Sequence, residues 1–177
     1  TGNSTGAAPS ANASTMRLAG LCQRPLAIAA MNELIYETVV STLSPSGVPH
    51  VAPMGVRYRG EHEVVLMPFK PSTTLENIKA TRCATLNIVA DVRVFAGSVT
   101  QRKNWPLSPT LRIPCMRLEC ALSHSELALT QMQDHEQRPI LTFERVAQMH
   151  HAAFLGFNRA QAAVVEGAIL VSRLFML

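Results

Sequence analysis

The sequence predicts a mainly β domain with helices (α+β): an antiparallel β-barrel with a short helix after its third strand and a longer helix near its C-terminal end. Three observations predict it. Short β-branched runs follow one another across tight turns, as in an antiparallel meander. A hydroxyl-rich segment opens a short amphipathic helix, and a longer helical pattern with an N-cap comes last. Strands in this arrangement favour a small barrel with peripheral helices.

The first three predicted strands lie between residues 33 and 69. The first, Glu33 to Leu43, is rich in β-branched residues. It is followed by the turn SPSG, which has Pro in its second position and Gly in its fourth. The second strand, VPHVAPMGVRYRG, contains Pro49 and Pro53, which favour an edge or a bulge. A charged turn around Glu61 leads to the third strand, EVVLMPF.

Three more strands and two helices complete the expected fold. A helix is predicted from about Thr74 to Thr81, because Thr73 and Glu76 have the spacing of a capping box. CATLNIVAD, residues 83–91, predicts a central strand, and residues 92–113 show no regular pattern. Two further strands are expected around 116–129 and 140–149. The final helix is expected to follow Asn158 as N-cap, with Gln161 in the position of a capping-box partner.

Composition limits the function classes. The 177 residues predict one folded domain over residues 31–177, after a disordered tail, leader or expression remnant at residues 1–30. The net charge of +4 is spread without a basic run, so no nucleic-acid partner is expected. No apolar run has the length of a membrane span. The four widely spaced cysteines indicate buried thiols in a reducing, cytoplasmic compartment, and no metal site is expected.

The segment PFKPSTT directly before the first helix can hold an anion. The first turn of a helix presents unpaired N–H groups and the positive end of the helix dipole. Three hydroxyl residues, Ser72 to Thr74, and the cation of Lys70 add donors there. Without a run of glycines, this arrangement suits a single phosphate monoester. The alternative is that Thr73 only caps the helix and Lys70 is solvated.

Four stretches together resemble the FMN-binding split-barrel flavoproteins, a superfamily that includes flavin reductases. They are APMGV (52–56), PFKPSTTLENI (68–78), ATLNIVAD (84–91) and GFNRAQAAVVEGAILVSRL (156–174). The combination is most similar to a branch with a domain of unknown function, and the resemblance covers about residues 33–174. Two departures stand out: Gly167 occupies a position where the family usually has Ala, and relatives continue beyond the last residue, Leu177.

The resemblance implies an antiparallel split β-barrel and a homodimer that binds FMN in a groove between subunits. Lys70 and the three hydroxyl residues would hold the phosphate, with Asn77 supporting their loop. Met54, Gly55 and Val56 would lie along the isoalloxazine ring. Asn87 would bond a flavin oxygen, or would instead pair with backbone inside the barrel. The cofactor-binding residues implied are thus Met54, Gly55, Val56, Lys70, Ser72, Thr73, Thr74, Asn77 and Asn87.

The implied activity is that of an oxidoreductase of flavin-reductase type that uses a reduced nicotinamide or a similar donor. Two alternatives stay open: a flavin-binding carrier without turnover, and the same barrel holding a deazaflavin or heme. No catalytic residue is assigned from the sequence, since the histidines qualify only by residue type. The cofactor would carry the redox chemistry, and the protein would supply orientation and access.

Overall fold

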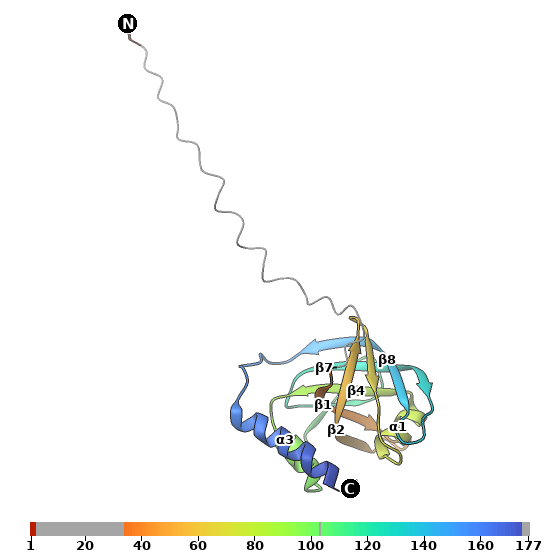
Figure 1. The fold of residues 1–177 in the computed structure, drawn as a ribbon. Coiled ribbons are helices and arrows are strands. Elements are labelled where there is room, and N and C mark those ends of the chain that lie inside the picture. The colour runs from red at the N-terminus through yellow and green to blue at the C-terminus, as the bar shows by residue number, and fades with distance from the viewer. Residues whose placement is uncertain (3–33, 103, 175–177) are drawn as a thin grey trace.

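The computed structural model describes residues 1–2, 34–102 and 104–174, so the predicted tail lies outside the described residues except for its first two. Six strands close into a barrel in the order β1-β2-β3-β8-β7-β4, with every neighbouring pair antiparallel (Figure 1). The strands are β1 (Tyr36–Leu43), β2 (Pro49–Arg59), β3 (Glu63–Leu66), β4 (Cys83–Val89), β7 (Ala121–Gln133) and β8 (Ile140–His150). Six barrel strands and their closure are confirmed, although the strand predicted around 116–129 belongs to the barrel only from Ala121 onward.

The turn between β1 and β2 sets the register of the first pair. Gly47 has a φ of 81°, a left-handed conformation that glycine adopts without strain, and its N–H donates to the Ser44 carbonyl at 2.9 Å. The two strands then pair over eight positions, from Leu43 opposite Pro49 to Tyr36 opposite Val56. The predicted turn thereby positions the APMGV segment along the first strand.

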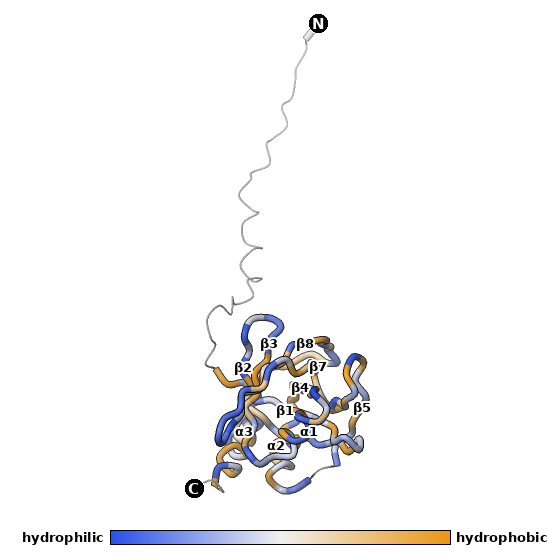
Figure 2. Tube along the Cα trace, turned by 90° about the vertical axis from the view of Figure 1, so that its right-hand side faces the viewer, coloured by the Kyte–Doolittle hydropathy of each residue, from blue (hydrophilic) through white to orange (hydrophobic). Residues whose placement is uncertain are grey.

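The barrel interior is filled by large apolar side chains from every strand. Val40, Leu66, Leu127 and Phe143 are fully buried there. Figure 2 shows hydrophobic residues within β2, β3 and β8 in this region. Helix α1 (Thr73–Thr81) contributes the apolar side chains of Leu75 and Ile78, so the helix is part of the same core.

The N-cap of α1 corrects one expectation. The cap is Ser72, one residue before the predicted Thr73: its hydroxyl accepts from the Leu75 N–H at 3.3 Å. Its carbonyl accepts from the Glu76 N–H at 3.1 Å. The Glu76 carboxylate therefore does not close a capping box and instead pairs with Lys79 at 3.0 Å. With three hydroxyl residues in a row, the spacing alone did not distinguish which one begins the helix.

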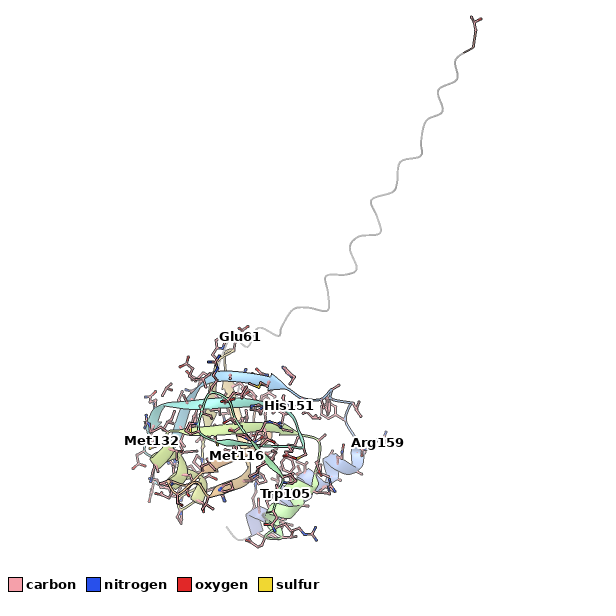
Figure 3. All side chains as sticks on the ribbon, turned by 180° about the vertical axis from the view of Figure 1, so that it is seen from behind. Glu61, Trp105, Met116, Met132, His151 and Arg159 are labelled. Atoms are coloured by element: carbon pink, nitrogen blue, oxygen red, sulfur yellow. The ribbon has the colours of Figure 1, made fainter. Side chains whose placement is uncertain are left out.

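Residues 92–113, predicted to be irregular, contain α2 (Arg93–Val99) and β5 (Leu107–Pro109), which pairs with β6 (Met116–Leu118). The helix forms because Val94 and Phe95 are buried in a second apolar cluster outside the barrel. A methyl group added at Gly97 would lie 2.5 Å from Trp105 Cζ2. The glycine thus lets the Trp105 ring pack directly against α2 (Figure 3).

Helix α3 (Arg159–Arg173) begins as predicted at Asn158, whose side chain accepts from the N–H groups of Ala160 and Gln161. The Gln161 amide does not reach back to the cap; it donates to the Ala90 carbonyl at 2.9 Å. The helix packs against α2 through Val165 and Ala168, yet none of its residues is buried. Among the described residues, no helix is long and apolar enough to cross a membrane.

A buried carboxylate on β7 anchors the turn between β5 and β6. Glu126 is fully buried and accepts from three consecutive backbone N–H groups, those of Leu111, Arg112 and Ile113, at 2.6 to 2.9 Å. Burial raises the pKa of Glu126, but these three bonds and His124 outweigh it, so the pKa is lowered overall. The charged form of Glu126 is therefore the one that holds the turn.

Candidate functional site

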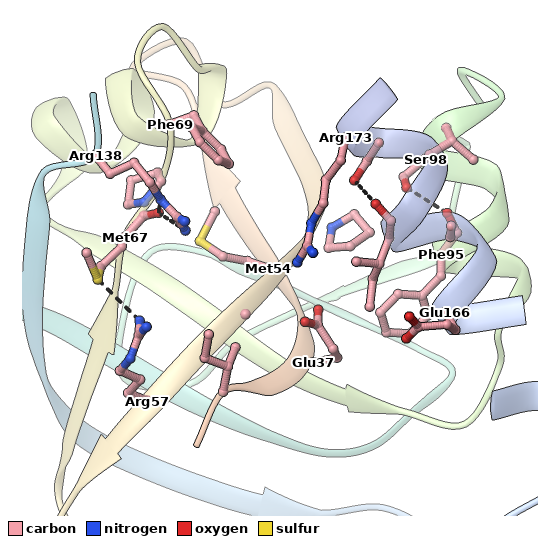
Figure 4. Close-up of a pocket in the computed structure, with 18 residues that line it drawn as sticks. Glu37, Met54, Arg57, Met67, Phe69, Phe95, Ser98, Arg138, Glu166 and Arg173 are labelled. Atoms are coloured by element: carbon pink, nitrogen blue, oxygen red, sulfur yellow. Dashed lines mark hydrogen bonds between the residues drawn. The ribbon is translucent and has the colours of Figure 1, made fainter. Parts of the chain in front are cut away.

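A cavity of about 650 Å³ opens between the barrel and the two later helices. One wall comes from β2 and from the segment that follows β3, and the opposite wall comes from α2 and α3 (Figure 4). This volume falls within the range of about 300–1,000 Å³ that is typical of small-molecule sites. The cavity lies at the junction of elements that are distant in sequence, as ligand sites commonly do.

The barrel wall of the cavity is largely apolar. Pro53 and Met54 come from β2, and Met67, Pro68 and Phe69 follow β3. Phe69 is 43% exposed, whereas Pro68 beside it is buried. An exposed aromatic ring beside two methionines offers a flat, polarizable surface to a planar ligand.

Two arginines converge on Met67 at the barrel end of the cavity. Arg138, from the loop between β7 and β8, donates through Nε and Nη2 to the Met67 carbonyl at 3.1 and 2.9 Å. Its guanidinium carbon lies 4.3 Å from the centre of the Phe69 ring. Arg57 of β2 approaches from the other side, with Nη1 3.2 Å from Met67 Sδ. Burial, and then the charges of Arg57 and Arg173, lower the pKa of Arg138.

The opposite end of the cavity carries charges of both signs. Glu37 of β1 lies near Arg173 and Glu166 of α3 (Figure 4). Burial raises the pKa of Glu37, the Arg173 charge lowers it, and Glu166 raises it again, with a raised pKa as the result. The acidic side chains of the cavity are thus grouped at its α3 end, away from Arg57 and Arg138.

The predicted phosphate loop lies beside this cavity. Phe69 lines it, whereas the four residues Lys70, Ser72, Thr73 and Thr74 are not part of its lining as the structure stands. Lys70 forms an ion pair with Asp134, Ser72 caps α1, Thr73 is exposed and Thr74 is buried. The structure therefore brings the loop next to the cavity without turning its donors into it.

Three other predicted residues have structural partners. The Asn77 amide is buried and donates to Thr42 Oγ1 of β1 at 3.0 Å, so it fastens α1 to the barrel. Asn87 lies inside the barrel wall, donates to the Val39 carbonyl at 3.1 Å and accepts from the Leu118 N–H at 2.9 Å. This arrangement corresponds to the second of the two predicted roles of Asn87, pairing with backbone inside the barrel. The Val56 side chain is buried in the barrel core and is absent from the cavity lining.

Met54 and Gly55 do line the cavity. At Gly55, the position that a Cβ would occupy is already filled: a methyl group there would lie 2.5 Å from Ile35 Cγ2 and 3.5 Å from a Glu37 oxygen. The glycine thus allows the segment before β1 to cross closely over β2. Ile35 and Gly55 both line the cavity, so this crossing is part of its wall.

Sequence reasoning missed the arginines, Phe69 and the acidic pair. Arg57 could have been placed on the outer face of β2, because Val56 beside it points inward and side chains alternate along a strand. Arg138 and the α3 residues carry no such signal, since only the fold brings them to the cavity. No histidine is among the described residues that line it. His151 instead contacts buried His124 across 2.8 Å on another part of the surface (Figure 3).

Comparisons with known proteins agree with this fold. A family model described as the N-terminal domain of a protein of unknown function, DUF447, matches residues 36–152. The comparison with curated proteins found no match.

Solved structures similar to this chain include an FMN-bound DUF447 protein from Methanosarcina mazei, with TM-score 0.69 and 21% identity over 82% of this chain and 78% of that one. The 2-nitrobenzoate 2-nitroreductase of Pseudomonas fluorescens has TM-score 0.58 and 24% identity over 65% and 64%. A putative flavin reductase with a split-barrel domain, from Shewanella frigidimarina, has TM-score 0.59 and 12% identity over 72% and 71%. The split-barrel fold expected from the sequence is confirmed.

Proposed function

This chain belongs to the DUF447 family, and from that premise we propose that it binds FMN and acts as an FMN-dependent oxidoreductase of flavin-reductase type. The observation that carries the proposal is the cavity of about 650 Å³, with its apolar wall and two arginines, on a fold shared with an FMN-bound family member. The similar nitroreductase and flavin reductase structures support a redox role on the same fold. FMN would supply the electron transfer, and the chain would bind and orient it.

The residues present fit such a cofactor. Met54, Met67 and Phe69 offer an apolar surface for a flat ring. The loop from Lys70 to Thr74 borders the cavity and can supply cationic and hydroxyl donors to the phosphate if Lys70 leaves Asp134. That change costs little, because the Asp134 side chain is 83% exposed and an exposed pair is weak. A heme is less well served, since no histidine lines the described cavity.

The first test is the absorbance spectrum of the purified protein after incubation with FMN and gel filtration. We expect flavin bands to stay with the protein fraction, and we expect that fraction to oxidise a reduced nicotinamide. Retained flavin without nicotinamide oxidation would favour the carrier alternative. Complete loss of FMN would contradict the proposed cofactor, and a deazaflavin would then be the next compound to test in the same experiment.

We further propose that the protein is a homodimer whose interface includes α3. Leu155 and Phe157, which precede this helix, are 99% and 96% exposed. Ala163, Gly167 and Val171 recur every four residues and form a stripe on α3, and a methyl group added at Gly167 would meet nothing within 4 Å. So much exposed apolar surface next to a cavity is typical of a contact with a second chain.

The dimer proposal predicts that Leu155→Glu combined with Phe157→Glu yields a monomer, as measured by light scattering during gel filtration. Buried carboxylates would oppose an apolar contact. The matched control is Val48→Glu, because Val48 is also exposed, at 60%, but lies in the turn between β1 and β2. A monomeric wild-type protein, or a double variant that keeps the dimer mass, would contradict this assignment.

A further inference from the structure

The positive end of the cavity is built from two arginines that have no acidic partner. Arg57 contacts Met67 Sδ, and Arg138 donates to the Met67 carbonyl. Neither forms an ion pair within residues 34–102 and 104–174. Lys70 differs in this respect, because Asp134 already accompanies its charge. Arg57 and Arg138 are therefore two cations of the cavity wall without a paired acid, whereas Arg173, the third arginine of the lining, lies near Glu37.

The two guanidinium groups are also held in place. Two hydrogen bonds to one carbonyl and stacking on Phe69 fix the plane of Arg138. Arg57 is placed by its strand, where its neighbour Val56 is locked in the core. A guanidinium has five N–H donors in a rigid fork, so most donors of both groups remain available after these contacts. A prearranged fork of this kind matches the two oxygens of a carboxylate or phosphate.

Keeping two like charges together in a half-buried site is unfavourable unless an anion joins them. The acidic residues of the cavity cannot serve, because Glu37 and Glu166 lie at its α3 end with Arg173 (Figure 4). Burial, and then the charges of Arg57 and Arg173, lower the pKa of Arg138, which agrees with repulsion among the cations of the cavity. The arrangement is thus poised for a negatively charged ligand group rather than for a neutral one.

We propose that Arg57 and Arg138 together bind an anionic group, a phosphate or carboxylate, of a ligand that enters this cavity beside Phe69. The proposal rests on the proposed function, because it concerns the same cavity. Two sources would present this chemistry: the phosphate of the flavin itself, or an acidic group of the molecule with which the flavin reacts. In both cases Arg138 fixes the position of the anionic group, and Arg57 contacts the same group from the side of β2.

The test measures the affinities of the wild-type protein, Arg57→Gln and Arg138→Gln for three probes: FMN, riboflavin, and inorganic phosphate with or without bound flavin. Arg59→Gln is the matched control, since Arg59 lies on the same strand but is exposed and pairs with Glu63 at 3.3 Å. We expect each cavity variant to weaken one anionic probe by at least about tenfold, as for a charged hydrogen bond. Thermal unfolding establishes that each variant is folded, and Arg138→Lys provides a second variant that keeps the charge.

The outcomes separate the two sources. Weaker FMN binding with unchanged riboflavin binding assigns the pair to the flavin phosphate. Unchanged FMN binding with weaker phosphate binding assigns it to a second anion. If the wild-type protein binds no FMN while phosphate binding still depends on both arginines, the proposed function fails and this inference stands. If the folded variants bind all three probes as the wild type does, or if the wild type binds neither FMN nor phosphate, the inference is overturned.

Discussion

Replacing Glu126 with alanine is expected to lower the free energy of unfolding by about 3–5 kcal/mol, the largest effect of any single change considered for this protein. The carboxylate is fully buried and accepts from three backbone N–H groups in residues 111–113. Its removal leaves those donors without an acceptor and releases the turn between β5 and β6. Chemical denaturation at neutral pH measures the difference.

The dependence on pH makes this prediction specific. The pKa of Glu126 is lowered in the folded protein, so its stabilisation is complete above the ordinary value of 4.5 and is lost as the pH falls through the lowered value. The stability gap between the wild type and the variant should therefore narrow on acidification below about 4.5. Burial, followed by the charge of His151, also lowers the pKa of His124, so both residues favour the folded state less in acid.

The control is Glu61→Ala, because Glu61 lies in the exposed turn between β2 and β3. A change of no more than about 0.5 kcal/mol is expected there. If Glu126→Ala costs as little as Glu61→Ala, or if its stability gap is constant from neutral to acidic pH, then the buried carboxylate does not hold the turn.

The barrel could be predicted because its strands obey local rules. β-branched content and the SPSG turn predict β1 and β2, and Asn158 marks the start of α3 by side-chain chemistry alone. Helix α2 escaped prediction because it has no side-chain cap: Val92 precedes it and offers no acceptor. It is stabilised by burial of Val94 and Phe95, which depends on neighbours that are distant in sequence.

The site was predicted less completely for the same physical reason. The loop from Lys70 to Thr74 carries a local anion-binding pattern, whereas Arg138 becomes a cavity residue only because the loop after β7 folds back onto Met67. Asn87 looked equally suited to a ligand or to the barrel, and only the position of the Leu118 N–H, which donates to it, distinguishes the two. Glu126 resembles any polar residue of a half-exposed strand until the turn at 111–113 covers it.

The second large effect is expected from Lys70→Ala combined with Thr74→Ala, which should weaken FMN binding by about 2–4 kcal/mol, the sum of two charge-assisted hydrogen bonds. The loop is held close to the cavity, since the Lys70 N–H donates to the Gln137 carbonyl at 2.9 Å and Phe69 lines the cavity wall. Flavin fluorescence during titration with FMN and with riboflavin measures the loss. Riboflavin binding should change little, because riboflavin lacks the phosphate.

Lys79→Ala is the control for the double variant, because Lys79 lies on α1 and forms an exposed ion pair with Glu76. Unchanged FMN affinity in the folded double variant would remove the loop from the site. Combining the double variant with Arg138→Gln then distinguishes one anion site from two. If the loop and the arginine hold the same phosphate, their effects on FMN affinity should be strongly non-additive. If Arg138 serves a separate anion, its replacement should leave the FMN affinity of the double variant unchanged.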